Sequence, residues 1–83
     1  MSTISGIKTL VNTSAEVFAG TSKLSARVFM RVRNLDDSVA CVVHGRTLEP
    51  GEQILLDFVS STVVTVMGYS KGRAVQIEVV ETA

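Results

Sequence analysis

The sequence has few of the residues that small proteins use for covalent or metal-based stabilisation. Its 83 residues include one cysteine, Cys41, and one histidine, His44, so neither an internal disulfide nor a four-ligand zinc site is possible. A domain of this length buries little more than ~60% of its unfolded surface and has a thin core. Disulfides, metals and partner subunits are the usual means of stabilising such domains, and of these three only a partner subunit is left for this sequence. We therefore expect one domain that forms a homo-oligomer or joins a larger assembly.

An excess of charge of either sign is also missing. Eight basic and eight acidic residues give a formal net charge of zero. Nucleic acid as a main partner normally demands a basic excess, so we expect no nucleic-acid partner. No apolar run approaches the roughly 18 residues of a transmembrane helix, so we expect no membrane partner. The first residues lack a basic segment followed by an apolar run, so no signal peptide is predicted, and synthesis in a cytoplasm is expected.

What the sequence does contain is alternation of apolar and polar residues, the pattern of β-strands. The clearest case is residues 27–33, where a strand would separate two sets of side chains. Val28, Met30 and Val32 would lie on one face, and Arg27, Phe29, Arg31 and Arg33 on the other. A helix would scatter the arginines around its circumference, so we predict a strand with an apolar inner face and a cationic outer face.

Further strands follow from the same alternation. Residues 39–44 are apolar on nearly both faces, which predicts a central strand. In the strand after it, an apolar face is predicted for Ile54, Leu56 and Phe58, and in the last strand for Val75, Ile77 and Val79. A strand is also predicted over 63–70, and shorter strands over 7–11 and 15–20. Together these give an all-β domain.

The single proline marks a corner. Proline presets the backbone for the second position of a turn, and glycine accepts the positive φ that a type II turn needs at the third. Pro50 and Gly51 are therefore predicted to form a structural turn that reverses the chain. Short strands with turn signals between them predict a small antiparallel β-sandwich or barrel of about six to seven strands with an extended N-terminal arm. Residues 1–14 would form the arm or a weak first strand, and residues 15–83 the β domain.

No group of residues has the composition of an active site. Cys41 and His44 are three apart on a predicted strand, so they would face opposite sides and cannot act as a nucleophile and its base. The carboxylates of Asp36 and Asp37 are explained by a solvated loop. No glycine-rich loop is present that would hold a phosphate. We predict no enzymatic activity, no metal and no cofactor.

The cationic strand face is the best candidate for a contact surface. Arg27, Arg31 and Arg33 flank Phe29, and a large exposed aromatic beside arginines is typical of a protein interface. The N-terminal arm through Ile7 and Lys8 would supply a second contact. Arginine and an aromatic on a sheet face also occur in single-strand-binding domains, so a nucleic-acid-binding barrel stays as an alternative.

The order of these pieces resembles small all-β virion proteins of tailed bacteriophages, over residues 16–81. Matching positions are Arg27, Val32-Arg33-Asn34-Leu35, Gly45, Leu48-Glu49-Pro50-Gly51-Glu52, and 75–81. The resemblance implies a structural protein of the virion, made in the host cytoplasm. Its expected role is capsid decoration as an oligomer, with the major capsid protein or other virion proteins as partners. Alternatives are a head–tail connector or tail component, and a module that binds carbohydrate or a host surface.

Overall fold

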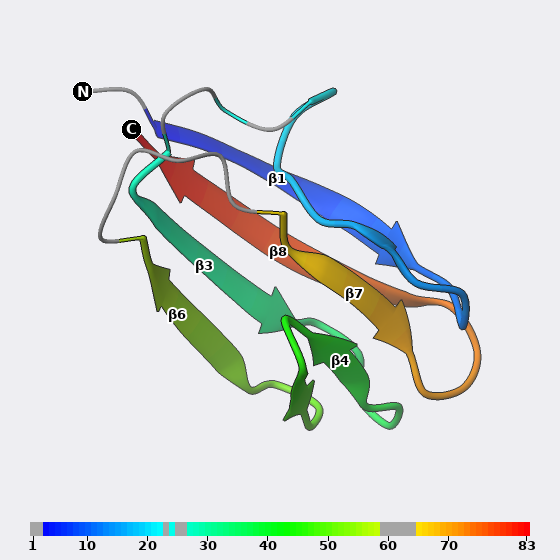
Figure 1. Ribbon diagram of the computed structural model, residues 1–83. Helices are drawn as coiled ribbons and strands as arrows, with labels where there is room; N and C mark the ends of the chain where they lie inside the picture. Colours follow the sequence, from blue (N-terminus) through cyan, green and yellow to red (C-terminus); the bar gives the residue numbers. More distant parts are fainter. Residues whose placement is uncertain (1–2, 23, 25–26, 59–64) are drawn as a thin grey trace.

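The computed structural model describes residues 3–22, 24, 27–58 and 65–83, and these form two antiparallel sheets. The first, sheet A, has four strands in the order β1 (Thr3–Leu10), β8 (Val75–Thr82), β3 (Phe29–Asn34) and β6 (Gln53–Asp57). The second, sheet B, has the order β2 (Ala15–Glu16), β7 (Met67–Ser70), β4 (Cys41–Val43) and β5 (Arg46–Leu48). Figure 1 shows β4 and β7 in front of sheet A, as a second layer. The predicted small antiparallel β-sandwich or barrel is thus confirmed, with eight strands among the described residues where six to seven were expected.

The core lies between the two sheets, where alternate side chains of each strand meet. In sheet A the inward residues include Met30 and Val32 of β3 and Ile54 and Leu56 of β6, all buried as predicted. In β8 the alternation is equally regular, with Val75, Ile77 and Val79 inside. All three residues of β4 are buried because this strand lies between β7 and β5, which confirms the predicted central strand.

The N-terminal segment is a strand rather than an extended arm. Strand β1 runs antiparallel to β8 over eight residues, from the pair Thr3–Thr82 to the pair Leu10–Val75. The structure thus has the first strand that the sequence offered as an alternative to an arm. Its even-numbered residues face the second layer, where Leu10 joins the core and Ile4 packs against it. Burial of these two aliphatic residues holds the otherwise polar segment in the sheet.

Strand β5 was not predicted from the sequence. His44 and Gly45 both have positive φ, 52° and 78°, which is the geometry of the two-residue type I′ turn that joins hairpin strands. The chain therefore reverses at Gly45, and β5 pairs with β4 from Arg46 opposite Val43 to Leu48 opposite Cys41. Histidine is uncommon at this turn position, where asparagine, aspartate and glycine are preferred, so the signal was missed.

The Pro50–Gly51 corner leads from β5 into β6 and so from sheet B into sheet A. Gly51 has φ 83°, and the Glu52 amide donates to the Glu49 carbonyl at 2.9 Å, as in a type II turn. The glycine is needed because other residues are strained at this φ.

Two of the strands predicted from the sequence are shorter in the structure. Of residues 15–20 only Ala15–Glu16 form a strand, and of 63–70 only Met67–Ser70 are in β7, with Val63 and Val64 outside the described residues.

Candidate protein-binding face

The outer face of sheet A brings together side chains from all four of its strands. The register places Arg31 between Val80 of β8 and Leu55 of β6, and Arg33 beside Glu78. On the other side of β8, Ile7 of β1 lies opposite the same Glu78. We define the outer face of sheet A by the outward residues Ile7, Phe29, Arg31, Arg33, Leu55, Asp57, Glu78 and Val80. Three of the predicted contact residues on β3 and one on β1 therefore share one surface.

The apolar residues of this face are unusually open to solvent. Ile7 is 53% exposed and Leu55 is 56% exposed, and both are large aliphatic side chains at the two lateral strands of the sheet. Phe29 and Val80 are half-buried between them. Leu55 was not selected from the sequence as a contact residue. The alternation of the sequence does indicate that Leu55 is exposed, because it has the outward position between the inward Ile54 and Leu56.

The charges of this face are mixed. Arg31 pairs with Glu78 at 3.0 Å and also donates to the Gln53 side-chain oxygen at 3.2 Å, so neighbours on both sides hold its guanidinium. Arg33 is exposed, and Asp57 of β6 lies opposite Phe29 of β3. Two basic and two acidic side chains thus share the face. The arrangement suits a partner with interspersed charges more than a uniformly anionic one.

Arg27 does not belong to this surface, which corrects the prediction. Its side chain is buried, with 2% of the residue exposed, and pairs with Glu81 inside the sandwich. Its guanidinium also donates to the Val17 carbonyl at 3.4 Å and lies 5.4 Å from the centre of the Phe58 ring. Val28, predicted to face inward, is 40% exposed. The alternation changes here because Val28 and Phe29 both lie opposite Thr82: Phe29 is its register partner, and the Val28 amide donates to the Thr82 carbonyl at 2.8 Å, as in a β-bulge.

Lys8 is also misplaced by the prediction. It lies on the inner side of β1, where its ammonium group donates to the Gly20 carbonyl and is 4.9 Å from the centre of the Phe18 ring. The segment that follows β2 therefore crosses the inner side of β1, and its contacts hold the Lys8 ammonium group on that side. Gly6, between Ile7 and Lys8, allows the approach, since a Cβ atom there would overlap the Ala19 carbonyl oxygen. Ile7 is thus the residue of this pair that reaches the outer face.

The Asp36–Asp37 loop is held by internal hydrogen bonds. Asp36 accepts from the backbone amides of Ser38 at 2.9 Å and Val39 at 2.7 Å, and Arg73 binds both of its oxygens. The two amides, followed by Arg73, lower the pKa of Asp36 from 3.8 to about 2. Beside it, the buried Asn34 donates to the Val39 and Leu48 carbonyls at 3.0 and 3.1 Å. The carboxylate therefore stabilises a loop.

Cys41 and His44 are separated in the structure as predicted from their spacing. Cys41 is completely buried, and burial, together with the Asp36 charge, raises the pKa of its thiol to about 11. His44 is exposed in the β4–β5 turn. Near the other corner, Glu52 accepts a hydrogen bond from the Glu49 amide at 2.7 Å, so this carboxylate supports the turn. Each group has a local structural role.

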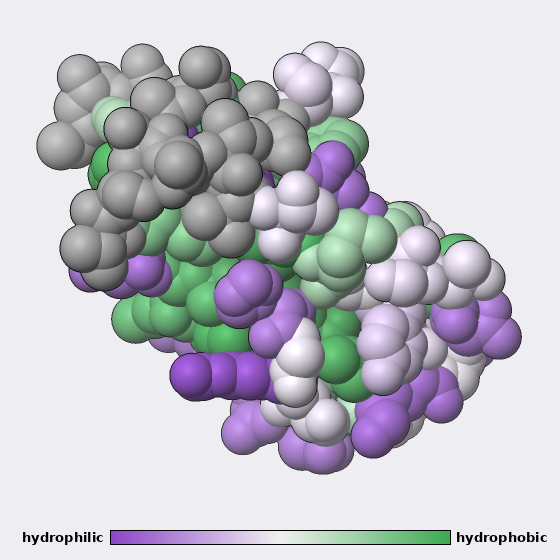
Figure 2. Space-filling model, in the orientation of Figure 1, coloured by the Kyte–Doolittle hydropathy of each residue, from purple (hydrophilic) through white to green (hydrophobic). Residues whose placement is uncertain are grey.

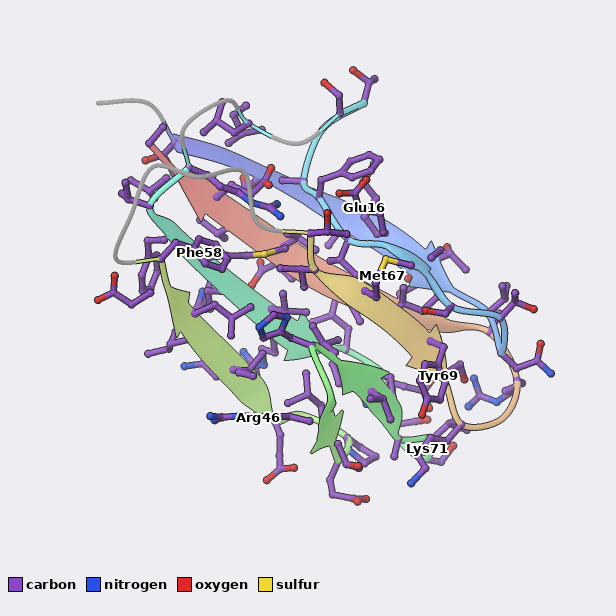
Figure 3. The ribbon with its side chains drawn as sticks, viewed as in Figure 1. Glu16, Arg46, Phe58, Met67, Tyr69 and Lys71 are labelled. Atoms are coloured by element: carbon purple, nitrogen blue, oxygen red, sulfur yellow. The ribbon has the colours of Figure 1, made fainter. Side chains whose placement is uncertain are left out.

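Sheet B presents a second outer face, the one nearest the viewer in the figures. Met67 and Tyr69 point outward from β7 in Figure 3 and are 41% and 38% exposed. Lys71 follows at the end of that strand. In Figure 2 this side is mostly pale and purple over β4 and β7, and its green area lies over β3 and β6. This face thus provides a natural site for control substitutions.

No pocket and no group of three or more His, Cys, Asp or Glu side chains suited to a metal ion is found among residues 3–22, 24, 27–58 and 65–83. The described part of the chain has no helix with the length and hydrophobicity needed to span a membrane. No protein-family model, curated protein or solved structure matches this chain.

Proposed function

We propose that this chain is a structural protein of a tailed-phage virion that binds the major capsid protein, or another virion protein, through the outer face of sheet A. The observation that carries the proposal is that Ile7, Phe29 and Leu55 share this face with Arg31 and Arg33, although they come from three strands. The virion setting comes from the sequence resemblance over residues 16–81, and the surface comes from the register of the sheet.

The composition of the face favours a protein partner. Interface centres are enriched in aromatic residues and arginine, and large side chains there supply most of the binding energy. Leu55 and Ile7 offer apolar area that a partner would remove from water, at roughly 25 cal/mol per Å². Arg31 is already held by Glu78 and Gln53, so little side-chain entropy is lost when it is covered.

Two alternatives are less well supported by the same surface. A single-stranded nucleic acid would meet Asp57 and Glu78 among the arginines, and the chain as a whole has no net positive charge. A carbohydrate platform needs aromatic rings, and Phe29 is the single aromatic residue among the eight that define the face. A connector or tail role would use the same face on a different virion protein.

The test is binding to capsids of the phage that encodes the chain, prepared without it. We expect the purified protein to sediment with these capsids, and Leu55→Asp and Arg33→Glu each to weaken binding at least tenfold. Tyr69→Ser, on the outer face of sheet B, is the matched control and should bind like the wild type. Unimpaired binding by both sheet A variants would refute the proposed face.

Absence of any binding to capsids would remove capsid decoration as the role. Imaging of whole virions then separates the alternatives, because a connector or tail component would be found at the neck or along the tail. Affinity for a single-stranded oligonucleotide that falls steeply with added salt would instead support a nucleic-acid-binding domain and count against the proposal. Specific binding on a glycan array would support the carbohydrate alternative.

A further inference from the structure

The lateral strands of the two sheets differ greatly in length. Sheet B ends in β2 and β5, which have two and three residues, whereas sheet A ends in β6, with five, and β1, with eight. Proteins commonly protect sheet edges by keeping edge strands short or by placing proline, charges or bulges on them. Strand β1 has none of these on its outward positions and pairs continuously with β8 over its whole length. It is therefore the edge best suited to accept another strand.

The direction of the free backbone groups follows from the bonds of β8. Its Thr82 carbonyl accepts from the Val28 amide at 2.8 Å and its Gln76 carbonyl from the Leu35 amide at 3.0 Å, so even-numbered residues of β8 bond toward β3. Odd-numbered residues must then bond toward β1, because successive residues of a strand bond to opposite neighbours. Through the register, these bonds reach Ile4, Gly6, Lys8 and Leu10. The amides and carbonyls of Thr3, Ser5, Ile7 and Thr9 thus point to the open edge.

We propose that two copies of this chain pair through their β1 strands, antiparallel, around a two-fold axis at Gly6. This register pairs residue 3 with 9 and residue 5 with 7, so that all four outward residues of each copy form ladder hydrogen bonds. Registers shifted by two residues leave one of the four without a partner. The two four-stranded sheets A would become one continuous sheet.

The side chains of β1 fit this register. Ile7 would lie opposite the partner subunit's Ser5 and diagonal to the partner subunit's Ile7, a separation of roughly 7–8 Å that large aliphatic side chains span. The pairing would therefore bury the edge-facing side of a residue that is 53% exposed in one copy, while its outward side stays on the outer face of sheet A. The strand's one charge, on Lys8, lies on the inner side against Gly20 and Phe18, and the two lysines would not be opposed.

A second copy is favoured over a foreign strand because the outward positions of β1 are self-complementary. Each outward residue finds a partner in the same strand reversed, and none of them is charged. The net charge of zero also removes repulsion between two copies. This inference does not rest on the proposed virion role, since it concerns only copies of the chain. If both hold, the pairing would join two outer faces of sheet A into one wider surface.

Amide hydrogen exchange of the purified protein tests the pairing. In the dimer we expect slow exchange at Ser5, Ile7 and Thr9 at high protein concentration and fast exchange after dilution. Ile4, Gly6 and Lys8, which bond to β8, should be protected at both concentrations. Light scattering should give twice the 8.9 kDa mass of the chain at the higher concentration. A monomer at all concentrations, or fast exchange at the three outward amides in a dimer, would overturn the inference.

Substitutions separate this edge from other contacts. Ser5→Pro removes an outward amide but no bond to β8, so it should raise the dimer dissociation constant at least tenfold in a folded protein. Ser5→Ala keeps the amide and should dimerise like the wild type. Ile7→Lys places two charges near the axis and gives the same loss without altering the backbone. Normal dimerisation of a folded Ser5→Pro or Ile7→Lys variant would contradict the pairing. Because capsid binding is tested with Leu55 and Arg33 variants, the two proposals fail separately.

Discussion

Arg27 and Glu81 form an ion pair inside the protein, with only 1% and 0% of their side chains exposed, although 54 positions separate them in the sequence. Glu81 also accepts from the Ala19 amide at 3.0 Å, and Arg27 donates to the Val17 carbonyl. The pair therefore connects the end of β8, the residues before β3 and the segment after β2. It fixes one end of the sandwich.

Removing one partner of this pair should be strongly destabilising. In Arg27→Met the Glu81 carboxylate stays buried without its cation, and in Glu81→Leu the guanidinium loses its anion. Each change should lower the free energy of unfolding by about 3–5 kcal/mol, the usual cost of an uncompensated buried charge. Denaturant titrations followed by circular dichroism measure this as a lower midpoint.

Two controls define this first prediction. The double variant Arg27→Met/Glu81→Leu should be more stable than either single variant, because no buried charge is left over. Glu78→Gln breaks the pair with Arg31, whose side chains are 32% and 36% exposed, and should cost less than about 1 kcal/mol. Strictly additive losses in the double variant would show that the two charges are not coupled.

The Asp36 carboxylate should make stability depend on pH in the acid range. Its pKa falls from 3.8 to about 2 on folding, because the amides of Ser38 and Val39, and then Arg73, favour the charged form. A lowered pKa contributes stability that is fully present above the unfolded value, near pH 4, and is lost as the pH falls toward 2. The wild type should therefore be more stable than Asp36→Asn at pH 6, with the difference shrinking between pH 4 and 2.

Unfolding titrations of both proteins across this range measure the effect, and NMR titration of the Asp36 carboxyl group measures the pKa directly. Asp37→Asn is the matched control, because the Asp37 side chain is 95% exposed and its carboxylate comes no nearer to the Arg73 guanidinium than 3.7 Å. Its stability profile should follow that of the wild type. A constant difference between wild type and Asp36→Asn over the whole range would exclude the linkage.

Gly6 should not tolerate a side chain. A Cβ atom at this position would overlap the carbonyl oxygen of Ala19, which is backbone and cannot rotate away. We expect Gly6→Ala to lower the free energy of unfolding by about 1–3 kcal/mol, as overpacking does. At Gly20 the nearest atom to an added Cβ is the Ser22 carbonyl oxygen at 3.8 Å, an ordinary contact. Gly20→Ala should therefore change thermal stability little, and equal losses in the two variants would contradict this account of the crossing.

The interior of the sandwich was accessible from the sequence because burial on one side imposes alternation. Met30 and Val32, Ile54 and Leu56, and the β8 series beginning at Val75 lie inside as predicted. The same alternation places Phe29, Arg31 and Arg33 on a common outer face. That these residues form a binding site is a prediction that the capsid experiment addresses.

Two of the errors lie where the chain leaves a regular strand, and one, Lys8, lies within β1. Arg27 is two residues before β3, and its burial depends on Glu81, a partner that no local pattern indicates. Lys8 obeys the alternation of β1, but its inward position depends on the segment at Gly20 that crosses the strand. Strand β5 was missed because its turn uses His44 at positive φ. In each case contacts distant in sequence, or an atypical turn residue, decided the outcome.

The place of β8 in sheet A has a consequence for biosynthesis. This strand is the last described along the chain and lies between β1 and β3. Strand β1 therefore cannot join β3 in one sheet until β8 has been translated. The ribosome must therefore release the chain as far as Thr82 before sheet A can close, and until then the earlier strands keep apolar surface uncovered. Such non-local pairing is associated with slow folding, in milliseconds to seconds, and the nascent chain is a natural client for chaperones.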